Sequence, residues 1–353
     1  MTRSAPPPPV ASRPSTAGAL PIEKSLDFAH AVAAGLTDSP RWLPCRFLYD
    51  ARGSALFEEI TRQPEYYLTR AEESILVRHA PEIRELTGPA TLIELGSGSS
   101  RKTGHLLAAY VLGRPRLLYV PIDVSGSALS SAARSLGEAH PRVEVVGIVG
   151  TYQSAFPLLR DHSPCLLLFL GSTIGNFETG ESVEFWRSIA RSLTVGDHFL
   201  LGVDLVKDRA TLEAAYNDRA HISDRFTRNL FERMNRELGA GVDVESVEHV
   251  ARYNEELQRM EIFARFLDDQ EVRIAPLGQR ISIRAGEMVL TEISRKFVLE
   301  DVEQHARVFG LEPVRSFTDH DRRFGLVLMR RTEQSLESLG TAEGGFEGRG
   351  EDG

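Results

Sequence analysis

The sequence predicts an α/β fold in which a doubly wound parallel sheet is joined to a second, α+β domain. From Thr91 onward, short apolar runs alternate with longer amphipathic segments, which is typical of a parallel sheet covered by helices. After Asp204 this alternation ends, and a long helical stretch is followed by strand-like runs. The 353 residues also exceed the size at which one hydrophobic core usually stops growing, so we expect an inserted domain.

The strands of the predicted sheet are short apolar runs bounded by Gly, Pro, Asp or Ser. The candidates are Leu92–Leu95, Leu117–Ile122, Val143–Val149, Leu166–Leu170 and Phe199–Val203. Amphipathic segments between them predict helices at Lys102–Leu112, Ala128–Glu138 and Glu181–Leu193. Strands that alternate with helices in this way form a doubly wound sheet.

The insertion is predicted to be mainly helical at first and then to form strands. The helical stretch covers Arg209–Leu238, and the strand-like runs are Met260–Phe266, Ile281–Ile283 and Met288–Ile293. The chain then returns to the sheet with a helix near Leu299–Phe309 and two closing strands, Pro313–Phe317 and Gly325–Met329.

These patterns predict the domain boundaries. One domain is expected to contain residues 71–206 and 297–331, and the second to contain residues 18–70 and 207–296. A proline run at the beginning of the chain and a Gly/Glu-rich end predict disordered tails at residues 1–17 and 332–353.

Composition excludes several classes of protein. A net charge of −9 with scattered basic residues argues against a nucleic-acid partner. Apolar runs such as Cys165–Leu170 are far shorter than the roughly 20 residues of a membrane helix, and prolines stand where a signal peptide has its apolar core. We therefore expect a cytoplasmic monomer with no membrane segment. Two cysteines, Cys45 and Cys165, and histidines without zinc-like spacing predict neither a disulfide framework nor a metal site.

A glycine turn follows the first predicted strand. The sequence LIELGSGSS at residues 92–100 leads directly into a helix beginning near Lys102. Glycine lets the backbone approach a ligand closely, and ligands of such sheets bind beyond the carboxyl ends of the strands. A purely structural turn is the alternative for Gly96 and Gly98.

Asp123 strengthens the prediction of a nucleotide-like ligand. It ends the second strand, 27 residues after Gly96, where a carboxylate can accept hydrogen bonds from both ribose hydroxyls. Adenosine is therefore favoured, although NAD and S-adenosylmethionine both carry it. Arg101 stands where the dinucleotide fingerprint has its third glycine.

Four further motifs carry a resemblance to a known family. They are Tyr49–Phe57 (YDARGSALF), Pro64–Arg70 (PEYYLTR), Phe169–Phe177 (FLGSTIGNF) and Thr291–Ser294 (TEIS). With the glycine turn, they make the chain similar to the histidine Nα-methyltransferases of ergothioneine biosynthesis from about Leu20 to Arg331.

The resemblance implies a class I, Rossmann-like methyltransferase domain that binds S-adenosylmethionine, and a second domain that binds histidine. It implies three successive methyl transfers, which give trimethylhistidine (hercynine). Carried over by matching motif, the amino-acid site would contain Tyr49, Tyr66, Gly171, Asn176, Tyr216, Glu292 and Ser294, with Asn176 and Tyr49 catalytic. The cofactor would be held by Gly96, Lys102, Asp123, Thr151 and Tyr152.

The chemistry of these side chains agrees with such roles. Methyl transfer from a sulfonium needs an amine lone pair aligned with the methyl carbon. Asn176 can donate and accept at once, so it can hold the head group of an amino acid, and Tyr216 can donate to its carboxylate. Glu292 and Ser294 stand two residues apart, so on a strand both would face one side and could bind the two imidazole nitrogens.

Each of these assignments has a structural alternative. Asn176 could cap the helix that follows, Glu292 could be a surface carboxylate, and Tyr66 and Tyr67 could simply fill the core. The proton that leaves the amine could pass through Tyr49 or directly to water.

Two positions depart from the family's pattern. Where the family typically has Gly-Asp-Phe, this chain has Gly150-Thr151-Tyr152, so a weaker uncharged acceptor replaces a carboxylate. Where the histidine enzymes have methionine near the imidazole, the matching residue is Ile262. These departures leave open the methylation of another amino acid such as tryptophan. An NAD-binding Rossmann oxidoreductase and a catalytically silent relative are separate alternatives.

Overall fold

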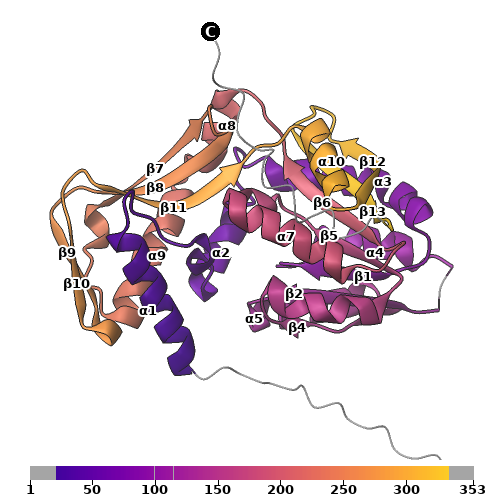
Figure 1. Ribbon diagram of the computed structural model, residues 1–353, viewed down its shortest axis with the longest axis horizontal. Helices are drawn as coiled ribbons and strands as arrows, with labels where there is room; N and C mark the ends of the chain where they lie inside the picture. Colours follow the sequence, from indigo (N-terminus) through magenta and orange to yellow (C-terminus); the bar gives the residue numbers. More distant parts are fainter. Residues whose placement is uncertain (1–20, 99, 114, 334–353) are drawn as a thin grey trace, which may run out of the picture.

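The computed structural model describes residues 21–98, 100–113 and 115–333. Its central feature is an eight-stranded sheet with the strand order β12-β13-β6-β5-β1-β2-β3, in which β4 also pairs with β2 (Figure 1). The strands are β1 (Thr91–Leu95), β2 (Leu117–Asp123), β3 (Val143–Val145), β4 (Ile148–Val149), β5 (Cys165–Phe169), β6 (His198–Asp204), β12 (Leu311–Thr318) and β13 (Phe324–Arg331). β1 to β6 pair in parallel, whereas β13 is antiparallel to both β6 and β12.

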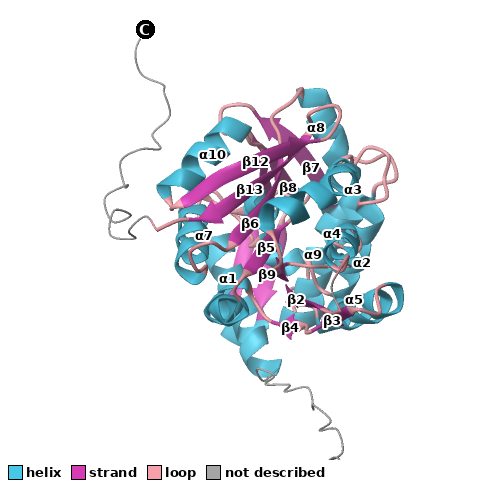
Figure 2. Cartoon of the chain, turned by 90° about the vertical axis from the view of Figure 1, so that its right-hand side faces the viewer, coloured by secondary structure: helices cyan, strands magenta, loops and turns pink. Residues whose placement is uncertain are grey.

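Helices cover both faces of this sheet (Figure 2). Leu92 packs in the hydrophobic cluster on one face and Ile93 in the cluster on the other, as the alternation of a strand requires. The first face carries α3 (Leu68–Thr87), α4 (Gly104–Tyr110) and α5 (Gly126–Ala139), and the second carries α6 (Tyr152–Ala155), α7 (Thr179–Ser192) and α10 (Leu299–Val308). The predicted doubly wound α/β class is confirmed.

A three-stranded antiparallel sheet forms the core of the remaining part. Its strands are β7 (Val247–Asn254), β8 (Arg259–Phe266) and β11 (Met288–Arg295), and a separate hairpin contains β9 (Gln270–Ile274) and β10 (Gln279–Ile283). Four helices pack around them: α1 (Pro21–Thr37), α2 (Ala51–Ile60), α8 (Arg209–Tyr216) and α9 (Ile222–Leu238). The segment before α2 adds to the sheet, because the Leu43 N–H donates to the Leu290 carbonyl at 2.7 Å.

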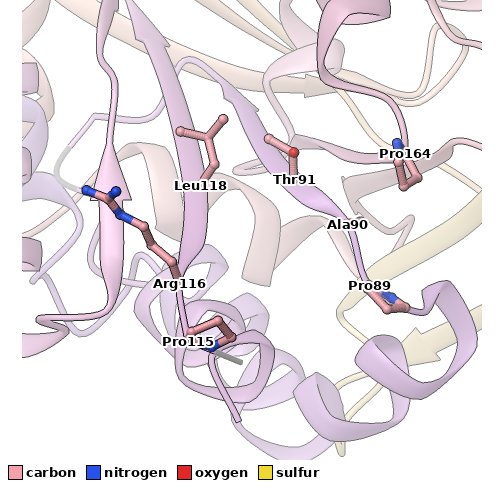
Figure 3. A pocket seen from close by; sticks show the side chains of 7 residues that line it. All are labelled: Pro89, Ala90, Thr91, Pro115, Arg116, Leu118 and Pro164. Atoms are coloured by element: carbon pink, nitrogen blue, oxygen red, sulfur yellow. The ribbon is translucent and has the colours of Figure 1, made fainter. Parts of the chain in front are cut away.

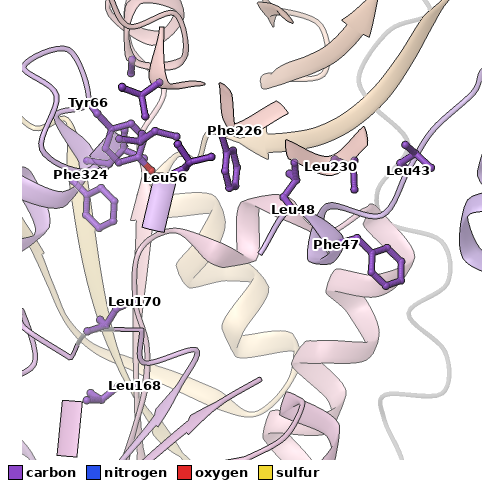
Figure 4. Packing of buried hydrophobic residues seen from close by; sticks show 14 of the residues in the cluster. Leu43, Phe47, Leu48, Leu56, Tyr66, Leu168, Leu170, Phe226, Leu230 and Phe324 are labelled. Atoms are coloured by element: carbon purple, nitrogen blue, oxygen red, sulfur yellow. The ribbon is translucent and has the colours of Figure 1, made fainter. Parts of the chain in front are cut away.

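One continuous hydrophobic cluster joins the two parts of the chain. It includes Leu168 and Leu170 near the end of β5 and reaches Phe226 and Leu230 on α9 (Figure 4). Two of the three predicted connections between the parts, near residues 206 and 297, also run side by side, since the Phe297 N–H donates to the Asp204 carbonyl at 2.9 Å. Asp204, at one of these connections, therefore contacts side chains from both parts of the chain. The domain boundaries stay a prediction.

Several elements differ from the sequence prediction. The single strand expected at 143–149 is divided into β3 and β4, and the helical stretch at 209–238 is broken between α8 and α9. The break forms because the Asp218 carboxylate accepts the N–H groups of Ile222 and Ser223, at 2.8 and 2.7 Å, and so begins α9. β7 and β9 were not predicted.

The two predicted tails lie almost entirely outside the residues that the structure describes. The predicted N-terminal tail, residues 1–17, lies outside the described residues. Of the predicted C-terminal tail only residues 332 and 333 are described, and the Thr332 N–H donates to the Gly310 carbonyl at 3.0 Å. Within the described ranges, no helix is both long and apolar enough to span a bilayer.

A shallow surface hollow of about 380 Å³ lies at the amino ends of the central strands (Figure 3). It is lined by Pro89, Ala90, Thr91, Pro115, Arg116, Leu118 and Pro164. Its one charged lining residue, Arg116, forms an ion pair with Glu144. The predicted site residues lie beyond the opposite, carboxyl ends of these strands, where doubly wound sheets bind ligands.

Candidate active site

The glycine turn after β1 and the end of β2 lie against each other. Gly96 has a φ of +67°, and a Cβ atom there would be 3.1 Å from the Tyr152 hydroxyl oxygen. The Asp123 Oδ2 atom accepts the Gly98 N–H at 2.9 Å, and the Gly150 N–H donates to the Asp123 carbonyl at 3.0 Å. The fold thus brings together Gly96, Asp123 and Tyr152, which were predicted to bind the cofactor.

The same turn fits an adenosine-bearing ligand. Among the described residues, the Ser97 hydroxyl has no hydrogen-bond partner although it is buried, and such a group is usually satisfied by a ligand or by water. Asp123 supplies a carboxylate at the carboxyl edge of the sheet. Thr151 is exposed at the start of α6, so its hydroxyl is accessible there.

Glu72 of α3 connects the cofactor side of the site to Gly171. Its fully buried carboxylate forms an ion pair with Lys102 and accepts the Gly171 N–H at 2.8 Å. Gly202 on β6 leaves room for it, because a Cβ atom at that position would collide with Glu72 Oε1. Sequence analysis missed Glu72, since a glutamate in an amphipathic helix carries no signal of burial.

A second buried carboxyl lies beneath the turn. Glu94 on β1 accepts the Thr103 hydroxyl proton at 2.8 Å and is also hydrogen-bonded by Tyr119. Burial raises the pKa of Glu94 to about 7. Because the Tyr119 hydroxyl oxygen also lies 2.8 Å from Ser100 Oγ, this network ties the strand to the turn.

Asn176 and Glu292 meet at the substrate side. Asn176 ends a short 3₁₀ helix, η3 (Thr173–Asn176), and its Nδ2 atom lies 3.3 Å from Glu292 Oε1. The capping alternative is wrong, because Glu178 is the N-cap of α7 and forms a capping box with Glu181. The Asn176 amide is therefore directed to Glu292 and not to the helix that follows.

A β-bulge determines which residues of β11 face the site. The register shifts between Leu290 and Glu292, so that Glu292 pairs with Ile262 and Ser294 pairs with Met260. Directly paired residues share a face of an antiparallel sheet, and a bulge changes which side chains point to that face. Glu292 and Ser294 do face the same side, as predicted, and Ile262 lies opposite Glu292.

Hydroxyl groups and a buried lysine surround Ser294. The Tyr216 hydroxyl donates to Ser294 Oγ at 2.8 Å, and the Lys296 ammonium lies 2.9 Å from both oxygens. Lys296 also forms an ion pair of 2.9 Å with Asp204, and both side chains are fully buried. Sequence analysis missed these two charged residues, although Lys296 continues the alternation of Glu292 and Ser294.

Four tyrosines that the sequence analysis considered are buried or partly buried around this network. The Tyr66 and Tyr216 rings pack edge to face with centroids 6.2 Å apart, and Tyr49 packs against Phe57 on α2, at 5.4 Å. Tyr67 does more than fill the core, because its hydroxyl lies 2.8 Å from both carboxylate oxygens of Asp204. Burial, and then the charge of Glu292, raise the pKa of Tyr49, so its hydroxyl is neutral.

The carboxyl of Glu292 has a pKa close to neutrality. Burial raises this pKa to about 7, while the charge of Lys296 and the hydrogen bond from Asn176 act in the opposite direction. Because Glu292 is also only partly exposed and accepts a hydrogen bond from Asn176, the alternative of an ordinary surface carboxylate is wrong. A carboxyl in such surroundings is typical of a binding or catalytic site.

Comparison with known proteins identifies the family of this chain. Residues 28–331 match a family described as histidine-specific, SAM-dependent methyltransferases. Histidine N-alpha-methyltransferase of Mycolicibacterium smegmatis is 41% identical over 85% of this chain and 94% of its own length. Ergothioneine biosynthesis protein 1 of Neurospora crassa is 33% identical over 86% of this chain and 34% of its own length. 4-Dimethylallyltryptophan N-methyltransferase of Claviceps purpurea is 27% identical over 79% and 86%. The chain therefore belongs to the family of histidine-specific methyltransferases that depend on S-adenosylmethionine.

Proposed function

We propose that this protein transfers methyl groups from S-adenosylmethionine to the α-amino group of free L-histidine, and that three transfers give hercynine. The observation that carries the proposal is the 3.3 Å contact between Asn176 Nδ2 and Glu292 Oε1. It brings an amide that can bind an amino-acid head group next to a carboxylate that can accept an imidazole N–H.

Family membership decides between the two adenosine cofactors that the glycine turn alone left open, in favour of S-adenosylmethionine. When bound, this cofactor supplies an electrophilic methyl group on a sulfonium. Its nucleoside part would be held at the carboxyl ends of β1 and β2 by Gly96, Asp123, Thr151 and Tyr152. Its carboxylate would be held by Lys102. Lys102 is positioned for this by its ion pair with Glu72.

Recognition of the imidazole ring is assigned to Glu292 and Ser294. Glu292 would accept the ring N–H, and the Ser294 hydroxyl would donate to the second nitrogen. The bulge before Glu292 supports this arrangement, because it places both side chains on one face of β11. A ring without two such nitrogens would leave a buried polar group unpaired, which is costly.

The amino-acid head group is assigned to Asn176, Tyr66, Gly171 and Tyr216. An in-line displacement depends on aligning the amine lone pair with the methyl carbon, and the Asn176 amide can contact both the amine and the carboxylate. The Tyr216 proton is directed at Ser294 and not at a substrate carboxylate, so Tyr216 is assigned to the wall of this site through its ring, which packs against Tyr66.

A proton must leave the nitrogen before each of the three transfers, because only a neutral amine has a lone pair that can attack the methyl carbon. The raised pKa of Tyr49 means that this side chain does not act as a phenolate base. Its neutral hydroxyl can accept one proton while it releases another, so we assign it the role of a relay to water.

Another ring-bearing amino acid is the alternative substrate. Ile262 lies opposite Glu292 where the histidine enzymes have methionine, and the Claviceps purpurea relative is named for a tryptophan derivative. Histidine is favoured because the relative named for histidine is 41% identical, against 27% for the relative named for tryptophan.

Mass spectrometry tests the proposal. The purified protein is incubated with S-adenosylmethionine and each of the common amino acids in separate reactions. We expect histidine to gain one, two and finally three methyl groups, whereas methylation of tryptophan but not histidine would contradict the proposal.

Two variants assign the reaction to the site. Glu292→Gln should lose most of the activity, because a neutral amide replaces the carboxylate that accepts the ring N–H. Glu271→Gln is the matched control, since Glu271 is exposed on β9 and bonded to Arg280 at 2.9 Å. Equal activity of both variants would show that the ring is not bound at Glu292.

A further inference from the structure

The Lys296 ammonium has three acceptors, all at 2.9 Å. They are Asp204 Oδ2, Tyr216 Oη and Ser294 Oγ. An ammonium group has three protons and no acceptor, so all three protons of Lys296 are used. The ammonium group thus contacts the Tyr216 hydroxyl and also the Ser294 hydroxyl, which we have assigned to the imidazole ring.

Counting hydrogen bonds determines what Ser294 can offer a ligand. A serine hydroxyl has one proton and two lone pairs. Lys296 donates to Ser294 Oγ, and so does the Tyr216 hydroxyl, at 2.8 Å. Both lone pairs are therefore occupied, and the proton is what remains for a ligand.

Asp204 is the counter-ion of Lys296 and also of a second lysine, Lys207. Lys207 binds Asp204 Oδ1 at 2.7 Å, and Lys296 binds Oδ2 at 2.9 Å. Lys207 also contacts Tyr67 and the Leu205 carbonyl. The hydrogen bonds that link an ammonium to Tyr216 and Ser294 come from Lys296. The two lysines therefore share a counter-ion but differ in their contact with the site.

We propose that Lys296 is a positioning residue that restricts Ser294 to donating its hydroxyl proton, so that the site selects a ring with an acceptor nitrogen at that position. This inference rests on the proposed binding of histidine by Glu292 and Ser294. Glu292 accepts from the ring and Ser294 donates to it, which matches a neutral imidazole in a single tautomer. Lys296 itself does not touch the substrate.

A double-mutant cycle tests this role. Lys296→Met removes the ammonium, and Asp204 keeps Lys207 as its partner. We expect KM for histidine to rise about 10- to 100-fold with a smaller change in kcat. In a Ser294→Ala background, Lys296→Met should raise KM by no more than about twofold further, because the hydroxyl through which it acts is gone. Lys207→Met is the matched control, and its KM should stay within about twofold of the wild type.

The outcomes separate the two proposals. If the wild-type protein does not methylate histidine, the proposed function is wrong. If it does, but the losses from Lys296→Met and Ser294→Ala multiply, or Lys207→Met raises KM equally, the role of Lys296 is wrong while the function stands. Binding of S-adenosylhomocysteine to each variant, measured by calorimetry, verifies that it is folded.

A second measurement needs no variant. An analogue of histidine in which C–H replaces the acceptor nitrogen, while the ring N–H is kept, should bind the wild-type protein at least about 100-fold more weakly, because the Ser294 proton loses its acceptor. Equal binding of histidine and this pyrrole analogue would overturn the inference even if Lys296→Met does not fold.

Discussion

A Cβ atom on Gly175 would lie 2.9 Å from the carbonyl oxygen of Arg295, so η3 and β11 touch backbone to backbone. This approach brings Asn176, the next residue, within reach of Glu292. A glycine at position 175 is therefore required by packing rather than by an unusual backbone angle.

Gly175→Ala is expected to reduce kcat/KM for histidine by about 100-fold, because a shift of one element by about 1 Å is enough to misplace reacting groups. Gly180→Ala is the control, since a Cβ atom at position 180 meets nothing within 4 Å. Steady-state kinetics of both variants check the expectation. Similar rates would mean that the contact between η3 and β11 does not position Asn176.

Glu292→Gln is expected to stabilise the fold above neutral pH although it impairs activity. Burial raises the pKa of Glu292 from 4.5 to about 7, so the folded chain favours the neutral carboxyl. The stabilising contribution of that carboxyl is complete below its unfolded pKa and is lost as the pH rises through about 7. Glutamine stays neutral throughout.

Urea denaturation measures this effect. The free energy of unfolding of Glu292→Gln, relative to wild type, should increase by about 1–3 kcal/mol between about pH 5 and about pH 8. Glu271→Gln, at an exposed position of β9, should show no such increase. A relative stability that falls with rising pH would contradict the raised pKa.

Glu72→Gln is expected to weaken cofactor binding about tenfold and to lower the free energy of unfolding by about 1–3 kcal/mol. The amide oxygen can still accept the Gly171 N–H, but Lys102 loses its buried counter-charge. Calorimetric titration with S-adenosylhomocysteine and thermal unfolding provide the measurements. Glu73→Gln is the neighbouring control, because Glu73 is partly exposed and its contact with Arg101 is 3.5 Å long. Unchanged cofactor affinity in Glu72→Gln would remove Glu72 from the binding machinery.

Ile262→Val is expected to raise the ratio of tryptophan to histidine methylation severalfold, because it enlarges the space opposite Glu292. Deleting one buried methylene should cost about 0.5–1.5 kcal/mol of stability. Phe263→Ala is the control, since Phe263 belongs to the other face of β8, where Arg252 lies over its ring. Competition between the two amino acids in one reaction gives the ratio directly, and an unchanged ratio would exclude Ile262 from substrate selection.

Most strands of the central sheet could be located along the chain because each is a short apolar run that ends at a turn signal. The glycine turn and Asp123 were predictable as one site, since the ends of parallel strands meet at a single edge. The boundaries were less accurate. The start of α9 depends on the Asp218 cap, and β7 has few fully buried positions, so its apolar alternation is weak.

The sequence by itself determined the local patterns: which segments are apolar, where glycine allows a turn, and that Glu292 and Ser294 alternate along a strand. Only the tertiary structure decided that the bulge before Glu292 directs both side chains to Asn176 and Tyr216, and that Glu72, Asp204 and Lys296 are buried. The physical reason is that burial of a charge depends on partners far apart in the chain. Asp204 and Lys296 are brought together where the two crossing segments pair, and no pattern local to either residue contains that contact.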